Sequence, residues 1–205
     1  MTLASESLPS IGAVLLRPFY RRSPVEVARD LLGKVLVHGK TAGTIVETEA
    51  YLGEGDLAAH AARGITGRTR VLFGPPGHAY VYFIYGMYEC LNLVAEPEGK
   101  AGCVLIRALE PVAGVDLMRR RRPTARKAED LANGPGKLTL AMAITRNQNG
   151  ADVTRGSLTV HEPVVRQPVE IAVTRRIGIT QSADLPLRFL IRGNRYVSRG
   201  TAQLT

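Results

Sequence analysis

Hydrophobic and polar residues alternate in several short stretches of this chain, a pattern typical of β-strands with two distinct faces. We expect strands at residues 34–38, 44–52, 102–109, 157–161, 169–174 and 187–192, with a turn at 39–43. Helical patterns cover 24–32, 56–62, 112–122 and 138–144; the first opens on Ser23-Pro24-Val25-Glu26, an N-cap serine, a proline and a capping-box glutamate. No repeat or domain boundary interrupts the pattern. We therefore expect one domain over residues 15–200, with a disordered N-terminal segment at 1–14.

The strand expected at 44–52 carries chemistry on one face. Its period of two places Ile45, Glu47, Glu49 and Tyr51 on one side and Val46, Thr48, Ala50 and Leu52 on the other. In the strand at 102–109 the same period places Arg107 beside Cys103 and Leu105. Two carboxylates and a tyrosine thus share a face, and a cation lies among core-facing neighbours.

Aromatic residues are concentrated in Tyr80-Val81-Tyr82-Phe83-Ile84-Tyr85-Gly86-Met87-Tyr88, which holds four of the seven tyrosines. The alternation, Gly86 and the apolar run at 90–94 predict a β-hairpin with an aromatic tip. Such a stripe is either core packing or a wedge that inserts into a ligand. Strand parity pairs Tyr80 with Tyr82 on one face and leaves Val81 and Phe83 as the expected core residues.

The net charge of the chain indicates the kind of partner that it would bind. The chain has 27 Lys and Arg against 18 Asp and Glu, a net charge of +9, which suits a polyanion and nucleic acid first of all. A solvated basic protein without such a partner is the alternative. No apolar run has the length of a membrane span and no signal peptide opens the chain, so we expect an intracellular protein. Cys90 and Cys103 lie in apolar runs and are expected to be reduced and buried.

The side chains that could do chemistry are few. The four histidines are scattered and no ligand spacing is typical of a metal site, so we expect no metal. No serine or cysteine lies in a nucleophile motif. Glu49, Tyr51 and the nearby His60 remain, and together with aromatic walls they suit hydrolysis of the bond between a base and its sugar. Two of these residues have a plainer interpretation: Glu49 as the partner in a salt bridge with a residue such as Arg107, and His60 as a surface histidine.

At this point a family resemblance emerges. The motifs that carry it are residues 45–53 (IVETEAYLG), 58–60 (AAH), 73–77 (FGPPG), 80–87 (YVYFIYGM), 91–92 (LN), 104–111 (VLIRALEP) and 133–138 (NGPGKL). Their order and length make the chain similar to the alkyladenine (3-methyladenine) DNA glycosylases, from about Leu15 to Ser198. The resemblance implies a mixed α/β (α+β) fold, a single domain with a largely antiparallel sheet, surrounding helices and a protruding hairpin that intercalates into DNA.

The resemblance also implies a reaction: damaged purines of the 3-methyladenine, hypoxanthine and ethenoadenine class are flipped out of duplex DNA and excised, leaving an abasic site. The roles it assigns are catalysis to Glu49, which activates water, and Arg107; base binding to Tyr51, His60, Tyr82 and Asn92; and intercalation to Tyr85, flanked by Met87. DNA backbone contacts are expected from Arg63, Arg68, Arg70 and Lys137. No lysine accompanies Glu49 in its motif, so we expect a monofunctional hydrolase.

We expect no cofactor, no membrane and a monomeric enzyme whose partner is double-stranded DNA with damaged purines, in the cytoplasm, at the nucleoid of a bacterium, or in a nucleus. Two other functions stay open at this level. A non-catalytic nucleic-acid-binding module could use the same basic face and aromatic hairpin for stacking. A hydrolase of free nucleosides or glycans would bind without regard to duplex context.

Overall fold

The computed structural model describes residues 11–198; residues 1–10 of the segment expected to be disordered lie outside the described residues. The α-helices are α1 (Arg17–Tyr20), α2 (Pro24–Asp30), α3 (Val115–Arg121) and α4 (Pro135–Met142). Short 3-10 helices occur at η1 (His60–Arg63), η2 (Arg70–Phe73), η3 (Ala128–Asp130) and η4 (Arg146–Gln148). The strands are β1 (Val35–His38), β2 (Thr41–Tyr51), β3 (Ala79–Ile84), β4 (Tyr88–Val94), β5 (Cys103–Ala113), β6 (Leu158–His161), β7 (Ile171–Thr174) and β8 (Arg188–Ile191).

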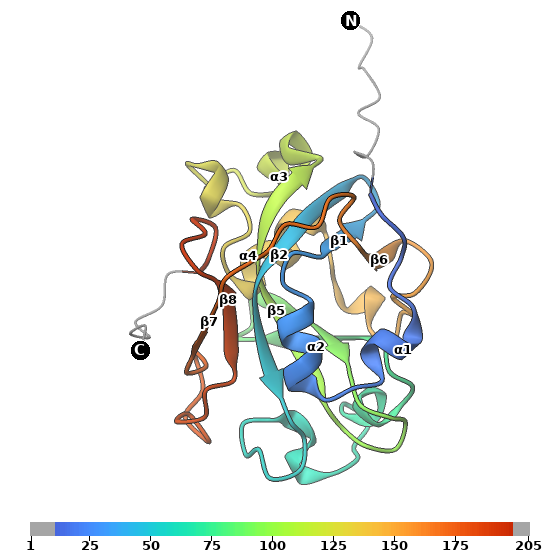
Figure 1. The fold of residues 1–205 in the computed structure, drawn as a ribbon. Coiled ribbons are helices and arrows are strands. Elements are labelled where there is room, and N and C mark those ends of the chain that lie inside the picture. The colour runs from blue at the N-terminus through green and yellow to red at the C-terminus, as the bar shows by residue number, and fades with distance from the viewer. Residues whose placement is uncertain (1–10, 199–205) are drawn as a thin grey trace, which may run out of the picture.

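Strand β2 is the centre of an antiparallel sheet whose main order is β3-β4-β5-β2-β1-β6. One edge of β2 pairs with β5 along its length. The other edge is shared, because β1 pairs with residues 41–44 and β8 with residues 47–49, and β7 then pairs with β8. Figure 1 shows β7 and β8 beside β2, on the side away from α1. The mixed α/β fold with a largely antiparallel sheet is confirmed.

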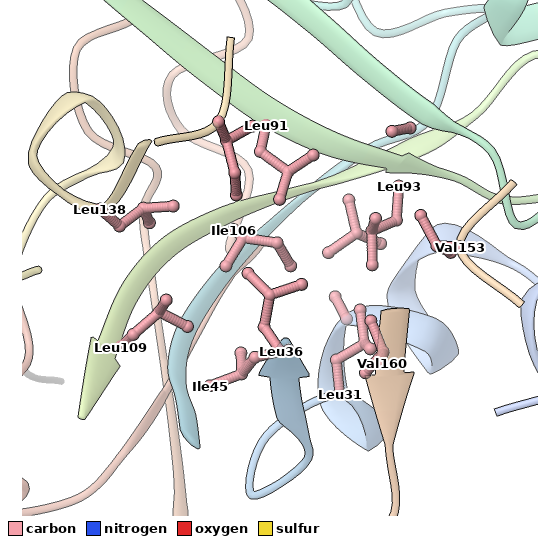
Figure 2. Packing of buried hydrophobic residues seen from close by; sticks show 14 of the residues in the cluster. Leu31, Leu36, Ile45, Leu91, Leu93, Ile106, Leu109, Leu138, Val153 and Val160 are labelled. Atoms are coloured by element: carbon pink, nitrogen blue, oxygen red, sulfur yellow. The ribbon is translucent and has the colours of Figure 1, made fainter. Parts of the chain in front are cut away.

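The main core lies between one face of this sheet and helices α2 and α4. Helix α2 begins as expected, since Ser23 Oγ accepts a hydrogen bond from the Glu26 N–H and the Glu26 carboxylate accepts one from the Ser23 N–H. Figure 1 shows α2 lying across β2 and β5. Figure 2 shows the aliphatic side chains that meet there, labelled at Leu31, Leu36, Ile45, Leu91, Leu93, Ile106, Leu109, Leu138, Val153 and Val160. With this face sealed by hydrocarbon, the opposite face is left for polar side chains.

A bulge in β2 corrects the expected arrangement of its side chains. The pairing with β5 shifts between Ile45 and Thr48, so that Val46 and Arg107 have no direct partner across the strands. One extra residue in a strand reverses the parity of what precedes it. Ile45 consequently belongs to the main core and not to the face of Glu49, where we expected it. Glu47, Glu49 and Tyr51 keep their common face.

Two expected helices are shorter or absent. Strand β5 continues to Ala113, which pairs with Ala42, and Gly114 at φ 64° then starts α3, so residues 112–114 are not helical. In the stretch 56–62 only the η1 turn forms, because the Asp56 carboxylate accepts hydrogen bonds from the Leu52 and Ala58 N–H groups and holds a loop. The helix expected at 138 begins at Pro135, and β2 begins at Thr41 within the expected turn.

The aromatic stretch does form a hairpin, β3 with β4. Strand β5 pairs with residues 92–94 of β4 only, so the half of the hairpin toward the tip projects beyond the sheet. Val81 lies in the core, as expected, but Phe83 lies in the projecting half and is exposed, with the Arg146 guanidinium 4.8 Å from its ring centre. The prediction of Phe83 as a core residue was wrong.

Both cysteines, Cys90 and Cys103, are buried and free, which confirms the expectation of reduced, buried thiols. Among residues 11–198 no helix is long and apolar enough to cross a membrane.

Candidate active site

A cavity of about 500 Å³ opens on the sheet face opposite the main core. Its walls come from β2 to β5, the loop before η1, the start of α4 and the segment after β7. Seven of the residues singled out in the sequence line it or reach it: Tyr51, His60, Tyr82, Tyr85, Asn92, Arg107 and Lys137. Other lining residues include Ala58, Tyr80, Cys90, Leu105, Gly136 and Ile177. The fold thus brings together residues that are up to 128 positions apart, from Tyr51 to Ile179.

Some expected site residues lie elsewhere. Met87 and the cations Arg63, Arg68 and Arg70 do not line the cavity and are exposed. Glu49 does not line it either: the carboxylate is fully buried behind Tyr51, Arg107 and Ile177, which do. Tyr51, Ile177 and Arg107, which all contact the Glu49 carboxylate, thus lie between it and the cavity.

The Glu49 carboxylate has a donor on each oxygen. Its Oε1 accepts from the Ile177 N–H at 2.7 Å and lies 3.2 Å from Arg107 Nη1, while its Oε2 accepts from the Tyr51 hydroxyl at 3.0 Å. Burial raises the pKa of Glu49 above its ordinary value, and the charge of Arg107 opposes that rise. The salt bridge considered as an alternative does exist. It is made by a carboxylate directly behind the wall of an aromatic cavity, so the contact is compatible with both interpretations.

Aromatic rings form one side of the cavity. The His60 ring meets the Tyr82 ring edge to face, with centres 4.6 Å apart, and the Tyr80 ring lies 5.4 Å from that of Tyr82. The Tyr80 hydroxyl is 2.9 Å from His60 Nδ1 and accepts from Arg68 Nε at 3.3 Å. Since Arg68 can only donate, the Tyr80 proton is free to go to Nδ1, and in that arrangement the ring proton of a neutral His60 is on Nε2. Partial burial, then the charge of Arg68, lower the pKa of His60 to about 4.

Asn92 is held in one orientation on the cavity wall. Its Nδ2 donates to the Tyr80 carbonyl at 3.2 Å, and its Oδ1 lies 3.8 Å from Cys103 Sγ, a thiol that donates weakly. Asn92 is buried, and so is Cys103, whose pKa burial raises to about 12. The amide therefore cannot turn without losing these two contacts.

The hairpin tip is the exposed aromatic edge of the site. Tyr85 is 74% exposed and has φ 53°, a left-handed conformation that costs a residue with a Cβ free energy, and Gly86 follows at φ 67°. The Met87 N–H closes the turn by donating to the Ile84 carbonyl at 3.2 Å. At the base of the tip, Tyr88 packs on Gly136 so closely that a Cβ there would lie 2.7 Å from the ring. The tip is thus fixed against the start of α4.

A buried ion pair supports the back of the site. Arg176 donates to both oxygens of Asp56, at 2.6 and 2.8 Å, and neither side chain is exposed. Its guanidinium also lies 4.6 Å from the centre of the Tyr51 ring and does not itself line the cavity. Arg176 directly precedes Ile177, so the pair fixes both the donor to Glu49 and the ring beside it.

Sequence reasoning missed the contributions of Ile177, Arg176 and Tyr80. Ile177 acts through its backbone N–H, and the residue type at a position does not indicate that its backbone N–H will bind a carboxylate. Arg176 stands in an unremarkable Arg-Arg pair far along the chain, and Tyr80 shares the parity of Tyr82, which was a usable signal. Among residues 11–198 no three His, Cys, Asp or Glu side chains are placed to hold a metal ion.

Comparison with known proteins adds a second line of argument. A family model described as methylpurine-DNA glycosylase matches residues 18–195. A protein of Methanoculleus marisnigri, named "Putative 3-methyladenine DNA glycosylase", is 56% identical over 187 residues, which cover 88% of this chain and 96% of the relative. Proteins with the same name from Methanocella arvoryzae and Koribacter versatilis are 55% and 50% identical, and cover 85% and 91% of this chain and 89% and 93% of themselves.

Proposed function

The chain belongs to the methylpurine-DNA glycosylase family, and from that premise we propose that it excises damaged purines from duplex DNA with a water molecule activated by Glu49. It is a DNA glycosylase, a hydrolase of N-glycosidic bonds. The finer proposal concerns the substrates, 3-methyladenine, hypoxanthine and ethenoadenine, the flipping of the base and the roles of the residues around the cavity.

One observation carries the proposal: a fully buried carboxylate lies directly behind the wall of an aromatic cavity that opens beside an exposed aromatic tip. A flat base that has left the duplex needs stacking partners, and Tyr51, His60 and Tyr82 offer them. A cavity of about 500 Å³ is large enough to receive a purine. The bond to the sugar would then lie at the mouth of the cavity, within reach of a water near Glu49.

Glu49 suits the work of a general base. Its raised pKa makes it more basic than an exposed carboxylate, and Arg107 and the Ile177 N–H favour its ionised form. The attacking water enters between the Tyr51 hydroxyl and Arg107, where it can replace Tyr51 on Oε2. The same negative charge then stabilises the oxocarbenium-like sugar as the base departs.

The cavity wall explains which bases would fit. A neutral His60 does not repel a base that already carries a positive charge, and its Nε2 proton can be donated to a ring acceptor. Asn92 is fixed, so the exocyclic amine at C2 of guanine, which adenine and hypoxanthine lack, would meet a group that cannot move aside, and guanine is disfavoured.

We propose that the enzyme acts as a monomer on duplex DNA and does not associate with a membrane. Tyr85 would fill the gap that the flipped nucleotide leaves, with Met87 beside it, because both are exposed at the end of a projecting hairpin. Arg63, Arg70 and Lys137 are proposed to contact phosphates. Arg68 already contacts Tyr80 and Tyr82, so its proposed phosphate contact would come from the edge of the cavity. Because such an enzyme acts on the chromosome, we propose that it is located in the cytoplasm, at the nucleoid of a bacterium, or in a nucleus.

The test is a panel of labelled duplexes that each contain one lesion. Alkali after incubation should cleave the strand at 3-methyladenine, hypoxanthine and ethenoadenine sites and leave undamaged duplexes whole. Without alkali the strand should stay intact, and borohydride should trap no protein on DNA although Lys137 lines the cavity, as expected of a monofunctional enzyme. A blank across all purine lesions would contradict the proposal.

A further inference from the structure

A second carboxylate, Glu47, is buried on the side of Arg107 away from the cavity. Its Oε1 accepts from Arg107 Nε at 3.0 Å, from Arg188 Nε at 2.6 Å and from the Ser198 hydroxyl at 2.8 Å. Its Oε2 accepts from the Ser198 N–H at 2.7 Å. The Glu47 carboxylate thus accepts four hydrogen bonds from the protein and has no surface exposed to solvent.

The elements that converge on Glu47 are far apart in the sequence. Arg107 comes from β5, Arg188 from β8, and Ser198 from the segment after β8. Figure 1 shows β8 beside β2, and the pairing between these strands includes Glu47 and Glu49. Arg188 is itself held, since its Nη1 donates to the Thr174 hydroxyl at 3.1 Å. A second register shift, between Glu47 and Thr48, leaves Arg107 of β5 without a partner across the strands, and Arg107 lies between the two carboxylates.

Arg107 is consequently held at two points. Its Nε is bound to Glu47 and its Nη1 lies 3.2 Å from Glu49, so the guanidinium can neither rotate about its long axis nor withdraw from the cavity. Its remaining protein acceptor, the Ile177 carbonyl, is at 3.5 Å, too long to fix the group alone. A buried ion pair contributes little net stability compared with apolar packing, which argues that the arrangement serves geometry.

We propose that Glu47 is a positioning residue for the glycosylase reaction, which orients Arg107 toward Glu49 and the attacking water from a site outside the cavity. This inference rests on the proposed function. Glu47 touches neither base nor sugar. Arg188 and Ser198 keep its carboxylate in place.

Glu47 also bears on the charge of Glu49. The groups that face Glu49 are Arg107 from β5, Tyr51 and Glu47 from β2, Arg176 from the segment after β7 and Cys90 from β4. Among them Glu47 is a like charge that raises the pKa of Glu49, whereas Arg107 lowers it. Removal of the Glu47 charge should therefore move the acidic limb of activity toward lower pH, which a purely structural residue would not do.

Two substitutions separate charge from geometry. Glu47→Asp keeps the charge but cannot span Arg107 and Ser198 together, so the plateau rate of single-turnover excision should fall by roughly 10- to 100-fold while the acidic limb stays in place. Glu47→Gln should lower the plateau and also shift the limb to lower pH. The matched control is Glu162→Gln, which removes a carboxylate paired with Lys34 beyond β6, and should match the wild type in both measurements.

The decisive comparison repeats Glu47→Asp in an Arg107→Lys background, where it should cost less than roughly threefold because the group that it positions is gone. An equal loss in both backgrounds, or a wild-type rate for Glu47→Asp, overturns the proposal.

Melting curves identify any variant that fails to fold. Ser198→Ala then replaces it. This change removes one hydrogen bond from a neutral donor to the Glu47 carboxylate and should slow excision roughly threefold only when Arg107 is present; wild-type rates would again overturn the proposal. Wild type and Glu49→Gln are measured on the same duplex, so a failure of the proposed function is recognised separately.

Discussion

Asp56→Asn is expected to destabilise the protein strongly, because it breaks the buried pair with Arg176. The amide keeps the size of the carboxylate and can still accept from the Ala58 N–H, but the guanidinium loses its counter-charge in a place without solvent. Removing one partner of a buried pair costs about 3–5 kcal/mol. A domain of this kind has a total free energy of unfolding of about 5–15 kcal/mol, so the effect is easily measured.

The assay is urea unfolding at pH 7, with the free energy taken from the midpoint and slope of the transition. Asp30→Asn is the matched control, since Asp30 also pairs with an arginine, Arg22 at 2.7 Å, but half of its side chain is exposed. That pair should contribute less than about 1 kcal/mol. If the two variants unfolded at the same urea concentration, the reasoning about the buried pair would be refuted.

The pH dependence gives a second check on the same pair. Burial alone would raise the pKa of Asp56, but hydrogen bonds from Arg176 and the Leu52 N–H hold it below its ordinary value. A depressed pKa contributes stability above the unfolded value, about 4, that is lost as the pH falls through the folded value. The difference between wild type and Asp56→Asn should therefore shrink below about pH 4, and a difference that grew there would contradict this sign.

Three further predictions concern the cavity and its rim. Tyr85→Ala should change the unfolding free energy by less than about 0.5 kcal/mol, because the ring is exposed, yet weaken binding to a lesion duplex in a titration; equal affinity would remove Tyr85 from the interface. Gly136→Ala should lower the free energy of unfolding, measured in urea, by about 1–3 kcal/mol because its Cβ meets the Tyr88 ring. In a Tyr88→Ala background the same substitution should cost much less. An equal loss in both backgrounds would refute the contact. His60 has a pKa lowered to about 4, so the stability that it contributes is present above its unfolded pKa of about 6.5 and is lost as the pH falls toward 4. His60→Phe should therefore flatten the fall in melting temperature between these two pH values. An unchanged slope would refute the lowered pKa of His60.

Much of this molecule follows from local patterns in the sequence. The hairpin at Tyr80–Val94, the capped start of α2 at Ser23 and the common face of Glu49 and Tyr51 were all predicted, because each depends on residues close together in the chain. Several motifs in a fixed order then identified the family. The comparisons agree with that identification.

What the sequence did not reveal depends on contacts between distant segments. The bulge that moves Ile45 to the core arises from pairing with β5, and parity within one strand cannot foresee it. Phe83 is exposed because β5 covers only the base of the hairpin. Ile177 reaches Glu49 through a backbone N–H that is fixed by an ion pair with Asp56, 120 positions away from Arg176. Such relations become visible only when the sheet is assembled.

The most direct test of the central claim is single-turnover excision by Glu49→Gln on a duplex that contains hypoxanthine. The amide should fit without rearrangement, since its oxygen can accept from the Ile177 N–H and its NH₂ can donate to the Tyr51 hydroxyl. Loss of the general base should slow excision by at least about 10²–10⁴-fold at unchanged affinity for the lesion duplex. Base release by Glu49→Gln at the rate of the wild type would contradict the assignment of Glu49 as the residue that activates water.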